Sequence, residues 1–175
     1  MSSALPNREQ AIELLHKNNC PPQVISHCIA VADIAVEIAS KLQRNGQSIN
    51  IELVEVGALL HDIGRSKIHT IDHAIVGAQI ANSVGLPETV IKIIKRHVGA
   101  GITLEEAKEL GWPRDVYTPE TLEEKVVSYA DKLIDNSKLV PIETEIKRLQ
   151  KKDKIQAAER VRKLHQEIAG LGIQL

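Results

Sequence analysis

Apolar residues recur every three or four positions along most of the chain, which is the period of an amphipathic α-helix. The clearest pattern predicts a helix from about Pro22 to Leu42, because proline is tolerated in a first helical turn and Gly46 follows as a stop signal. Its apolar stripe consists of Val24, Ile25, Cys28, Val31, Ile34, Ala35, Ile38 and Leu42. Such a stripe is typical of a helix that packs against a core.

The same periodicity continues in shorter segments, which are separated by glycine, proline and capping residues. It predicts helices over residues 7–18, 51–62, 72–85, 87–97, 103–110 and 121–137. An amphipathic tail follows over residues 142–169, and Asp153 with Gln156 is a candidate variant capping box that divides it. No convincing alternating strand pattern occurs. The sequence therefore predicts an all-α fold, a compact multi-helix bundle with a C-terminal amphipathic helical tail.

The length of 175 residues fits a single domain over 1–175, with a core over about 20–137 and a helical extension over about 142–170. Apolar positions of the tail are expected to pack either on the domain or on a second subunit of a homodimer. The basic stretch KRLQKKDK at 147–154 has acidic residues in and around it, which is typical of a solvated face rather than an RNA contact.

Composition and charge narrow the class of protein. Phenylalanine is absent and aromatic residues make up 2% of the chain, so Ile, Val, Leu and Ala must build the core. The formal net charge of −1 gives no overall field that would attract nucleic acid or an anionic membrane. No run approaches the ~20 apolar residues of a membrane span. Cys20 and Cys28 lack a CxxC spacing, so we expect them to be reduced core residues. We therefore expect a cytoplasmic protein with neither a membrane nor a nucleic-acid partner.

The stretch ALLHDIGR at residues 58–65 places a histidine and an aspartate between an apolar run and a glycine. His61 and Asp62 are either the polar tip of a helix or part of a metal site. Consecutive helical residues diverge by about 100°. At a helix end loosened by Gly64, both side chains can still reach one ion or two neighbouring ions.

Other histidines and an aspartate lie on or near apolar helix faces: His27, His73, His97 and Asp131. Asp131 lies between Val127 and Ile134, where a carboxylate is costly to bury unless it is paired or binds a cation. Polar groups near the apolar faces of five helices can converge only in the middle of a bundle. Imidazole nitrogen and carboxylate oxygen together suit a divalent transition ion.

The order of these residues resembles the H…HD…D signature of the HD-domain metal-dependent phosphohydrolases, and HDIG at 61–64 makes it the HDIG variant. The resemblance covers about residues 20–137. A tetrapeptide with the outer histidine and aspartate in order is far more specific than an HD dipeptide. Two further histidines fall where two-metal branches of the superfamily carry extra histidines. The metal ligands that the resemblance implies are His27, His61, Asp62, His73, His97 and Asp131.

The resemblance also implies an activity, the cleavage of a phosphate ester or anhydride of a nucleotide-like substrate by attack of metal-bound hydroxide. The cofactor would be one or two divalent ions, and Mn²⁺, Fe²⁺, Ni²⁺, Co²⁺, Zn²⁺ and Mg²⁺ all fit the ligand types. The partner would be a small phosphorylated molecule, a nucleotide. Monoesterase, phosphodiesterase and dinucleoside polyphosphate hydrolase all stay open. The alternative is a non-catalytic regulatory module that binds metal or nucleotide.

Cations near the motif are candidates for substrate contact. Arg65 takes the place of the lysine in the HDIGK of many two-metal relatives, and its planar fork suits two phosphate oxygens. We predict Asp62 and Arg65 as catalytic residues, and Arg65, Lys67 and Arg96 as substrate-binding residues. Arg96 stands where many relatives carry the first of two paired histidines.

Two aromatic residues and three histidines complete the candidates. Trp112 and Tyr117 are either a platform for a nucleobase or an anchor for their own loop. The histidines outside the signature are expected to face solvent: His16, His69 and His165.

Overall fold

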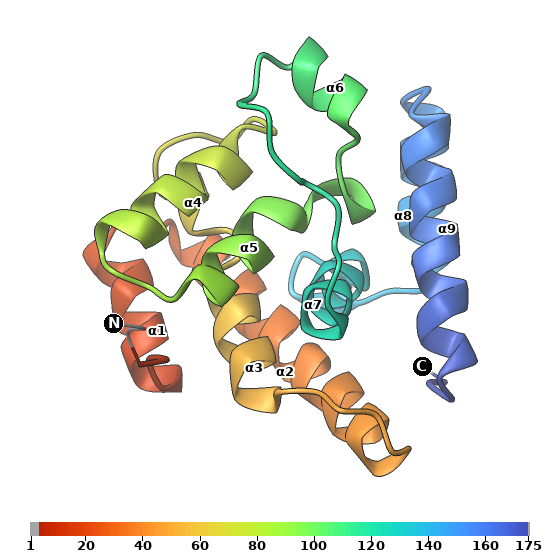
Figure 1. The fold of residues 1–175 in the computed structure, drawn as a ribbon, viewed down its shortest axis with the longest axis horizontal. Coiled ribbons are helices and arrows are strands. Elements are labelled where there is room, and N and C mark those ends of the chain that lie inside the picture. Colours follow the sequence, from red (N-terminus) through yellow and green to blue (C-terminus); the bar gives the residue numbers. More distant parts are fainter. Residues whose placement is uncertain (1–3, 175) are drawn as a thin grey trace.

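Helices make up most of the computed structural model, which describes residues 4–174 (Figure 1). The helices are α1 (Arg8–Lys17), α2 (Pro22–Arg44), α3 (Ile51–Leu60), α4 (His73–Ser83), α5 (Glu88–Arg96), α6 (Leu104–Glu109), α7 (Leu122–Lys132), α8 (Ile142–Lys151) and α9 (Ile155–Gly170), with 3₁₀ turns η1 (Ile63–Ser66) and η2 (Val98–Ala100). The all-α prediction is confirmed. The predicted helices up to residue 110 agree with the structure to within two residues at each end.

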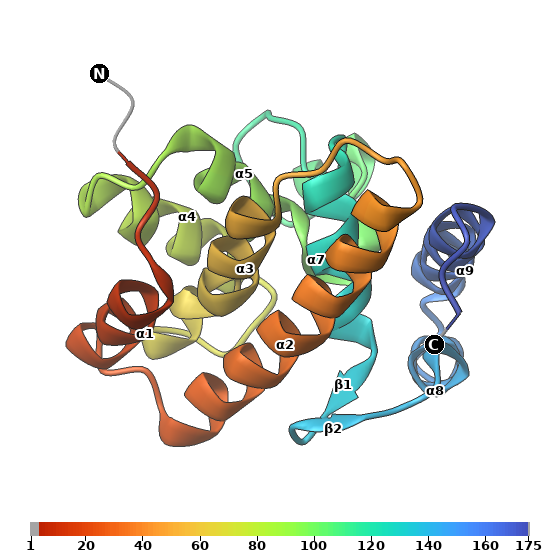
Figure 2. The same ribbon diagram turned by 90° about the horizontal axis from the view of Figure 1, so that it is seen from below.

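The core is built around α2 and α3, which pack along one another, while α7 lies against both (Figure 2). α4 packs on α5, and α1 packs on α3. Aliphatic side chains fill this core, as the composition predicts. His61 is the one polar residue among the largest fully buried side chains in the described part of the chain.

α2 is long and apolar enough to cross a membrane if length and composition alone are considered. In this fold its apolar face contacts α3 and α7. Val31 and Ile38, on that face, are fully buried. The apolar character of α2 is therefore that of a central core helix.

The predicted helix over 121–137 is too long. α7 ends at Lys132, and a short antiparallel hairpin follows, formed by β1 (Ile134–Asp135) and β2 (Lys138–Leu139). Asn136 and Ser137 form its turn with positive φ values of 47° and 60°, as a two-residue hairpin turn requires. Strands of two residues are too short to produce an alternating pattern, which is why the sequence did not reveal them.

The tail divides where it was predicted to divide, since α8 ends at Lys151 and α9 begins at Ile155. The capping box is wrong, because Asp153 adopts a positive φ of 57° and the N-cap is Lys154, which makes no side-chain capping bond. α9 packs on α8 and contacts α7 and η2 (Figure 1). Four of its apolar residues are buried against its own chain, Ala158, Val161, Leu164 and Ile168, whereas Ile155 is exposed.

A histidine of the tail corrects one further prediction. His165 is half-buried rather than solvent-facing, and its Nδ1 lies 2.8 Å from the hydroxyl of Tyr129 on α7. His16 and His69 are exposed, as predicted.

Candidate metal centre

The structure brings together all six residues that were predicted as metal ligands. His27 comes from α2 and Asp131 from the last turn of α7. The HD pair follows α3 directly, and the remaining two are the first residue of α4 and the residue after α5. The ligands thus come from the ends or inner faces of five helices, as the sequence pattern predicts.

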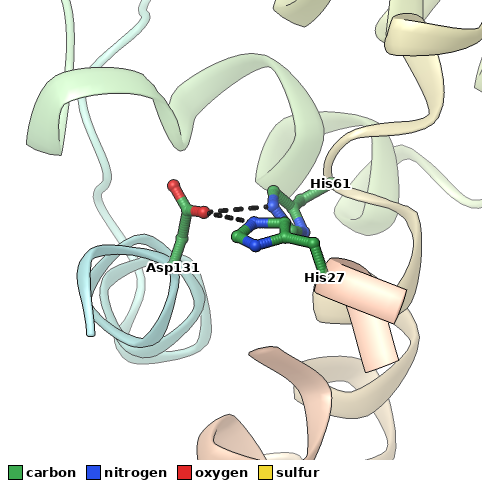
Figure 3. Close-up of side chains that lie close together, drawn as sticks. All are labelled: His27, His61 and Asp131. Carbon is green, nitrogen blue, oxygen red and sulfur yellow. Dashed lines mark hydrogen bonds and ion pairs between the residues drawn. The ribbon is translucent and has the colours of Figure 1, made fainter. Parts of the chain in front are cut away.

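The first group of these side chains consists of His27, His61 and Asp131 (Figure 3). Asp131 Oδ1 lies 3.0 Å from Nε2 of His27 and 3.3 Å from Nε2 of His61. One candidate ligand atom from each residue lies within 4.8 Å of the others. A single ion can therefore contact all three.

The second group consists of His61, Asp62 and His97, with His73 beside it. Asp62 Oδ1 lies 3.0 Å from Nε2 of His73 and 3.4 Å from Nε2 of His97. The two Nε2 atoms are 3.2 Å apart. His61 belongs to both groups, so the two sets of ligands form one continuous centre.

Backbone carbonyls fix the orientation of three of the rings. Nδ1 of His61 lies 2.6 Å from the carbonyl of Ala58, and Nδ1 of His97 lies 2.6 Å from the carbonyl of Ile94. His73 makes the equivalent contact with Thr70 at 2.8 Å. A carbonyl can only accept, so Nδ1 carries the proton in each neutral ring. Nε2 is left with a free lone pair, which is the form that binds a metal ion.

Two buried atoms of this centre have no hydrogen-bond partner among residues 4–174: Nε2 of His61 and Oδ1 of Asp62. Neighbouring nitrogen and oxygen atoms lie within 4 Å, but none is oriented to form a hydrogen bond with them. Unsatisfied buried polar atoms are rare because each is costly. A divalent ion contacted by both atoms would satisfy them, so the residues present fit such an ion.

The carboxylates of the centre are ionised. Burial opposes the charge on Asp62, but the nearby rings of His61, His73 and His97 hold its pKa well below the usual value. Burial likewise opposes the charge on Asp131, and the ammonium of Lys132 with the ring of His27 outweighs it and keeps this pKa low.

The two buried rings differ in their titration. Burial lowers the pKa of His97 to about 4, so this ring is neutral at neutral pH. Burial opposes the charge on His61 too, but Asp62 and Asp131 raise its pKa above the usual value. A bound cation would replace that proton as the partner of the two carboxylates.

The glycine of the HDIG stretch has a different role from the predicted loosening of a helix end. A Cβ on Gly64 would lie 1.9 Å from the carbonyl oxygen of His73 and 2.7 Å from the backbone nitrogen of Gly77. The backbone of η1 therefore packs directly on the first turns of α4. This close approach places His73 beside Asp62.

A cavity of about 1380 Å³ opens over the centre. Its walls come from α2, η1, α6, the β1–β2 hairpin and the facing sides of α8 and α9. Five of the candidate ligands also line it: His27, Asp62, His73, His97 and Asp131. The volume exceeds the ~300–1,000 Å³ of a typical small-molecule pocket, so a nucleotide-sized ligand has room to reach the ligand groups.

Of the predicted substrate-binding cations, Arg65 alone lines the cavity. Its Nε donates to Asp62 Oδ2 at 2.7 Å, and Nη1 donates to the carbonyl of His69 at 3.3 Å. Lys67 is exposed and lies outside the cavity wall. His69 is exposed and also lines the cavity.

Arg96 is not brought to the cavity either. Its buried guanidinium donates to Glu120 at 2.7 Å and to Glu124 at 3.0 Å, and its Nε donates to the carbonyl of Val116. The side chain therefore holds the loop before α7 against α5. The proximity of Arg96 to His97 in the sequence was misleading, because the two side chains point in different directions from the end of α5.

Replacing Arg96 by methionine is expected to lower the free energy of unfolding by about 2 kcal/mol, because Glu124 would keep a buried charge without its cation. The loss stays moderate since Glu124 also accepts from the backbone N–H of Glu120. Urea unfolding measures the difference. Arg8→Met, which removes two more exposed ion pairs, with Asp33 and Glu55, is the control and should cost less than about 1 kcal/mol. Equal losses in the two variants would contradict this role for Arg96.

Trp112 and Tyr117 anchor their loop. Their rings pack edge to face with centroids 5.0 Å apart, and both residues are buried. Trp112 Nε1 donates to Asp72 at 2.7 Å, just before α4, and the Tyr117 hydroxyl donates to the carbonyl of Pro113. Neither residue lines the cavity over the metal centre, so of the two roles left open by the sequence the structure favours the anchor.

Lys132 is a residue of the site that was not predicted as such from the sequence. It lines the cavity, and its Nζ lies 2.5 Å from Asp131 Oδ2. The signal was its place directly after Asp131 in a helix whose other residues are mostly apolar or capping.

The fold and the site define a helical protein with a histidine and aspartate centre suited to divalent ions. The HD domain family matches residues 24–135, and the chain belongs to this family. It is a member of the HD-domain phosphohydrolase superfamily, as the H…HD…D order predicted. The matched range lies within the predicted core.

Relatives of known sequence resemble most of the chain. An uncharacterized protein of Methanocaldococcus jannaschii is 48% identical over 144 residues, which are 82% of this chain and 85% of that protein. The tRNA (cytidine(56)-2'-O)-methyltransferase of Thermoplasma volcanium is 41% identical over 161 residues. This match includes 92% of the chain but 46% of the methyltransferase, so the chain spans about half the length of that relative.

A solved structure shows the same fold. The crystal structure of the HD domain of the L. monocytogenes phosphodiesterase PgpH in complex with cyclic-di-AMP superposes with a TM-score of 0.58. The two sequences are 23% identical, and the match covers 93% of this chain and 100% of the PgpH chain. The match therefore extends beyond the range that the HD domain family matches.

Proposed function

We propose that the protein is a metal-dependent phosphohydrolase acting on a phosphate ester or anhydride of a nucleotide-like substrate. The observation that carries this proposal is the convergence of six imidazole and carboxylate side chains, two of them with unsatisfied buried atoms and five of them lining an open cavity. One or two ions among Mn²⁺, Fe²⁺, Ni²⁺, Co²⁺, Zn²⁺ and Mg²⁺ would be held there by these six residues. Such an ion acts as a Lewis acid toward water and phosphoryl oxygens.

The residues of the chain bind and orient the substrate. Arg65 holds Asp62 with Nε and lies on the cavity wall, where its remaining N–H groups can donate to a phosphate oxygen. The cavity is also lined by apolar residues, among them Ile102, Leu149 and Ala157, which can contact a nucleoside. A phosphate at the ligand groups and a nucleoside on these apolar residues would fit within the cavity.

The named relatives favour a nucleotide as the ligand of this chain, but their own activities cannot all be assigned to it. The PgpH domain was solved with cyclic-di-AMP, which favours a nucleotide ligand for this fold. The methyltransferase activity belongs to a protein about twice as long as the matched segment. We do not extend it to this chain, since the candidate centre is a set of metal ligands.

We expect the chelator-treated protein to hydrolyse bis-p-nitrophenyl phosphate or p-nitrophenyl phosphate only after a divalent ion is restored. The rate should rise at least about 100-fold with one of Mn²⁺, Ni²⁺ or Co²⁺, because these ions stabilise transition-state charge by several kcal/mol. Release of p-nitrophenol measures turnover, and the faster substrate distinguishes a diesterase from a monoesterase. A nucleotide panel then narrows the substrate.

The competing function is a regulatory module that binds metal or nucleotide without turnover. The longer relative from Thermoplasma volcanium favours this alternative, because a segment similar to this chain forms part of a larger enzyme there. A folded, metal-loaded protein that hydrolyses neither ester nor any nucleotide of the panel would replace our proposal with this one.

A further inference from the structure

Lys132 has an unusual position for a lysine. It is the last residue of α7, its side chain is 8% exposed, and it lines the cavity beside the candidate metal centre. Burying an ammonium group is costly unless it is paired. The contacts that it makes in return explain its burial.

The ammonium group joins both groups of metal ligands. Nζ lies 2.5 Å from Asp131 Oδ2 and donates to the backbone carbonyl of His97 at 3.4 Å. Ser128, about one turn earlier on α7, donates to the same carbonyl at 2.9 Å. The end of α7 therefore holds Asp131 by its side chain and His97 by its backbone.

The two oxygens of Asp131 consequently have separate partners. Oδ1 faces Nε2 of His27 and Nε2 of His61 (Figure 3), while Oδ2 faces Lys132. A carboxylate with one oxygen occupied by an ammonium has a single oxygen left for an ion. One-oxygen coordination leaves a further position on the ion for substrate or water.

We propose that Lys132 is a positioning residue, which restricts Asp131 to one-oxygen coordination and couples the two ligand groups through His97. The inference rests on the proposed function, because it assigns the geometry of the same centre. Lys132 acts through Asp131 and His97 and takes no part in bond making.

The test uses the full chain loaded with Co²⁺, whose visible absorption reports coordination number. In Lys132→Met the freed Oδ2 can also bind the ion, so the Co²⁺ absorption should weaken toward that of a higher coordination number. The dissociation constant of the metal should differ from that of the wild type by about tenfold. The kcat for bis-p-nitrophenyl phosphate should fall by about 10- to 100-fold, with little change in KM. Lys132→Arg, which can still bond Oδ2, should restore part of the wild-type spectrum and kcat.

Lys138→Met is the matched control, because Lys138 is an exposed residue of β2 outside the cavity wall. It should leave the spectrum and affinity as in the wild type. A folded Lys132→Met protein with an unchanged Co²⁺ spectrum and metal affinity would overturn the inference. If Lys132→Met does not fold, as judged by circular dichroism, Lys132→Gln undergoes the same measurement with the same criteria.

The spectral readout separates this inference from the proposed function. If the wild type hydrolyses no ester with any ion, the proposed function fails. The Co²⁺ spectra of wild type and variant still decide whether Lys132 sets the coordination of Asp131.

Discussion

Replacing Asp131 by alanine is expected to remove the ion from the group formed with His27 and His61, and to lower ester hydrolysis at least about 10³-fold. Asp131 is the only carboxylate in that group of ligands, and its oxygen faces both rings. Without it, the ion would keep two imidazoles of this group, and the nearest carboxylate would be Asp62, whose Oδ2 lies 3.9 Å from Nε2 of His27 and 3.7 Å from Nε2 of His61. Lys132 would also lose its ion-pair partner and keep only the carbonyl of His97.

Metal content after dialysis and calorimetric titration with Mn²⁺ measure the loss directly. Asp131→Asn keeps the volume of the side chain but removes its charge, so it separates a defect in ligation from a packing defect. Asp33→Asn, on the exposed side of α2, is the matched control and should retain wild-type metal affinity. Wild-type metal content in a folded Asp131→Ala protein would show that the ligand assignment is incorrect.

Replacing Gly64 by alanine is expected to lower the free energy of unfolding by more than about 4 kcal/mol, or to displace η1 from α4. The added Cβ would meet backbone atoms of His73 and Gly77, and backbone cannot rotate away as a flexible side chain can. Displacement of η1 would move His73 away from Asp62. Loss of stability and weaker metal binding should therefore appear together.

Urea unfolding and metal titration of the same variant test this coupling. Gly170→Ala provides the control, since Gly170 is helical and a Cβ there meets nothing within 4 Å. We expect that control to be neutral or slightly stabilising. If Gly64→Ala behaved like Gly170→Ala, the packing of η1 on α4 would not be what positions His73.

The helices and the candidate ligands were predictable from the sequence for different reasons. The 3.6-residue period predicts the helices, and it shows that Asp131 lies near an apolar face, where a carboxylate needs a partner. The full set of six candidate ligands was implied by the resemblance to the HD-domain family. The β1–β2 hairpin was not predictable, because two-residue strands carry no period. Ranges such as 121–137 were therefore extended past the true helix end at Lys132.

Side-chain direction was the least predictable property. Arg65 and Arg96 are both arginines beside a signature residue, yet one lines the cavity and the other pairs with Glu120 and Glu124. The partners of Arg96 lie more than twenty residues away along the chain. The role of Gly64 was missed similarly, since its contact with His73 depends on how η1 and α4 pack.

The carbonyls that orient the histidine rings suggest how this centre could be transplanted. His61, His73 and His97 each pair with the carbonyl three residues earlier in the chain. The C-terminal ends of α3 and α5 leave such carbonyls free of intrahelical bonds, so His61 and His97 meet an acceptor supplied by their own turn. Thr70 instead lies in the turn before α4, and its carbonyl also accepts from the backbone N–H of His73. A designer who grafts the centre into another bundle should therefore transfer each four-residue segment from the carbonyl to the histidine, with its backbone geometry. A histidine transferred alone would lack the carbonyl that fixes its tautomer.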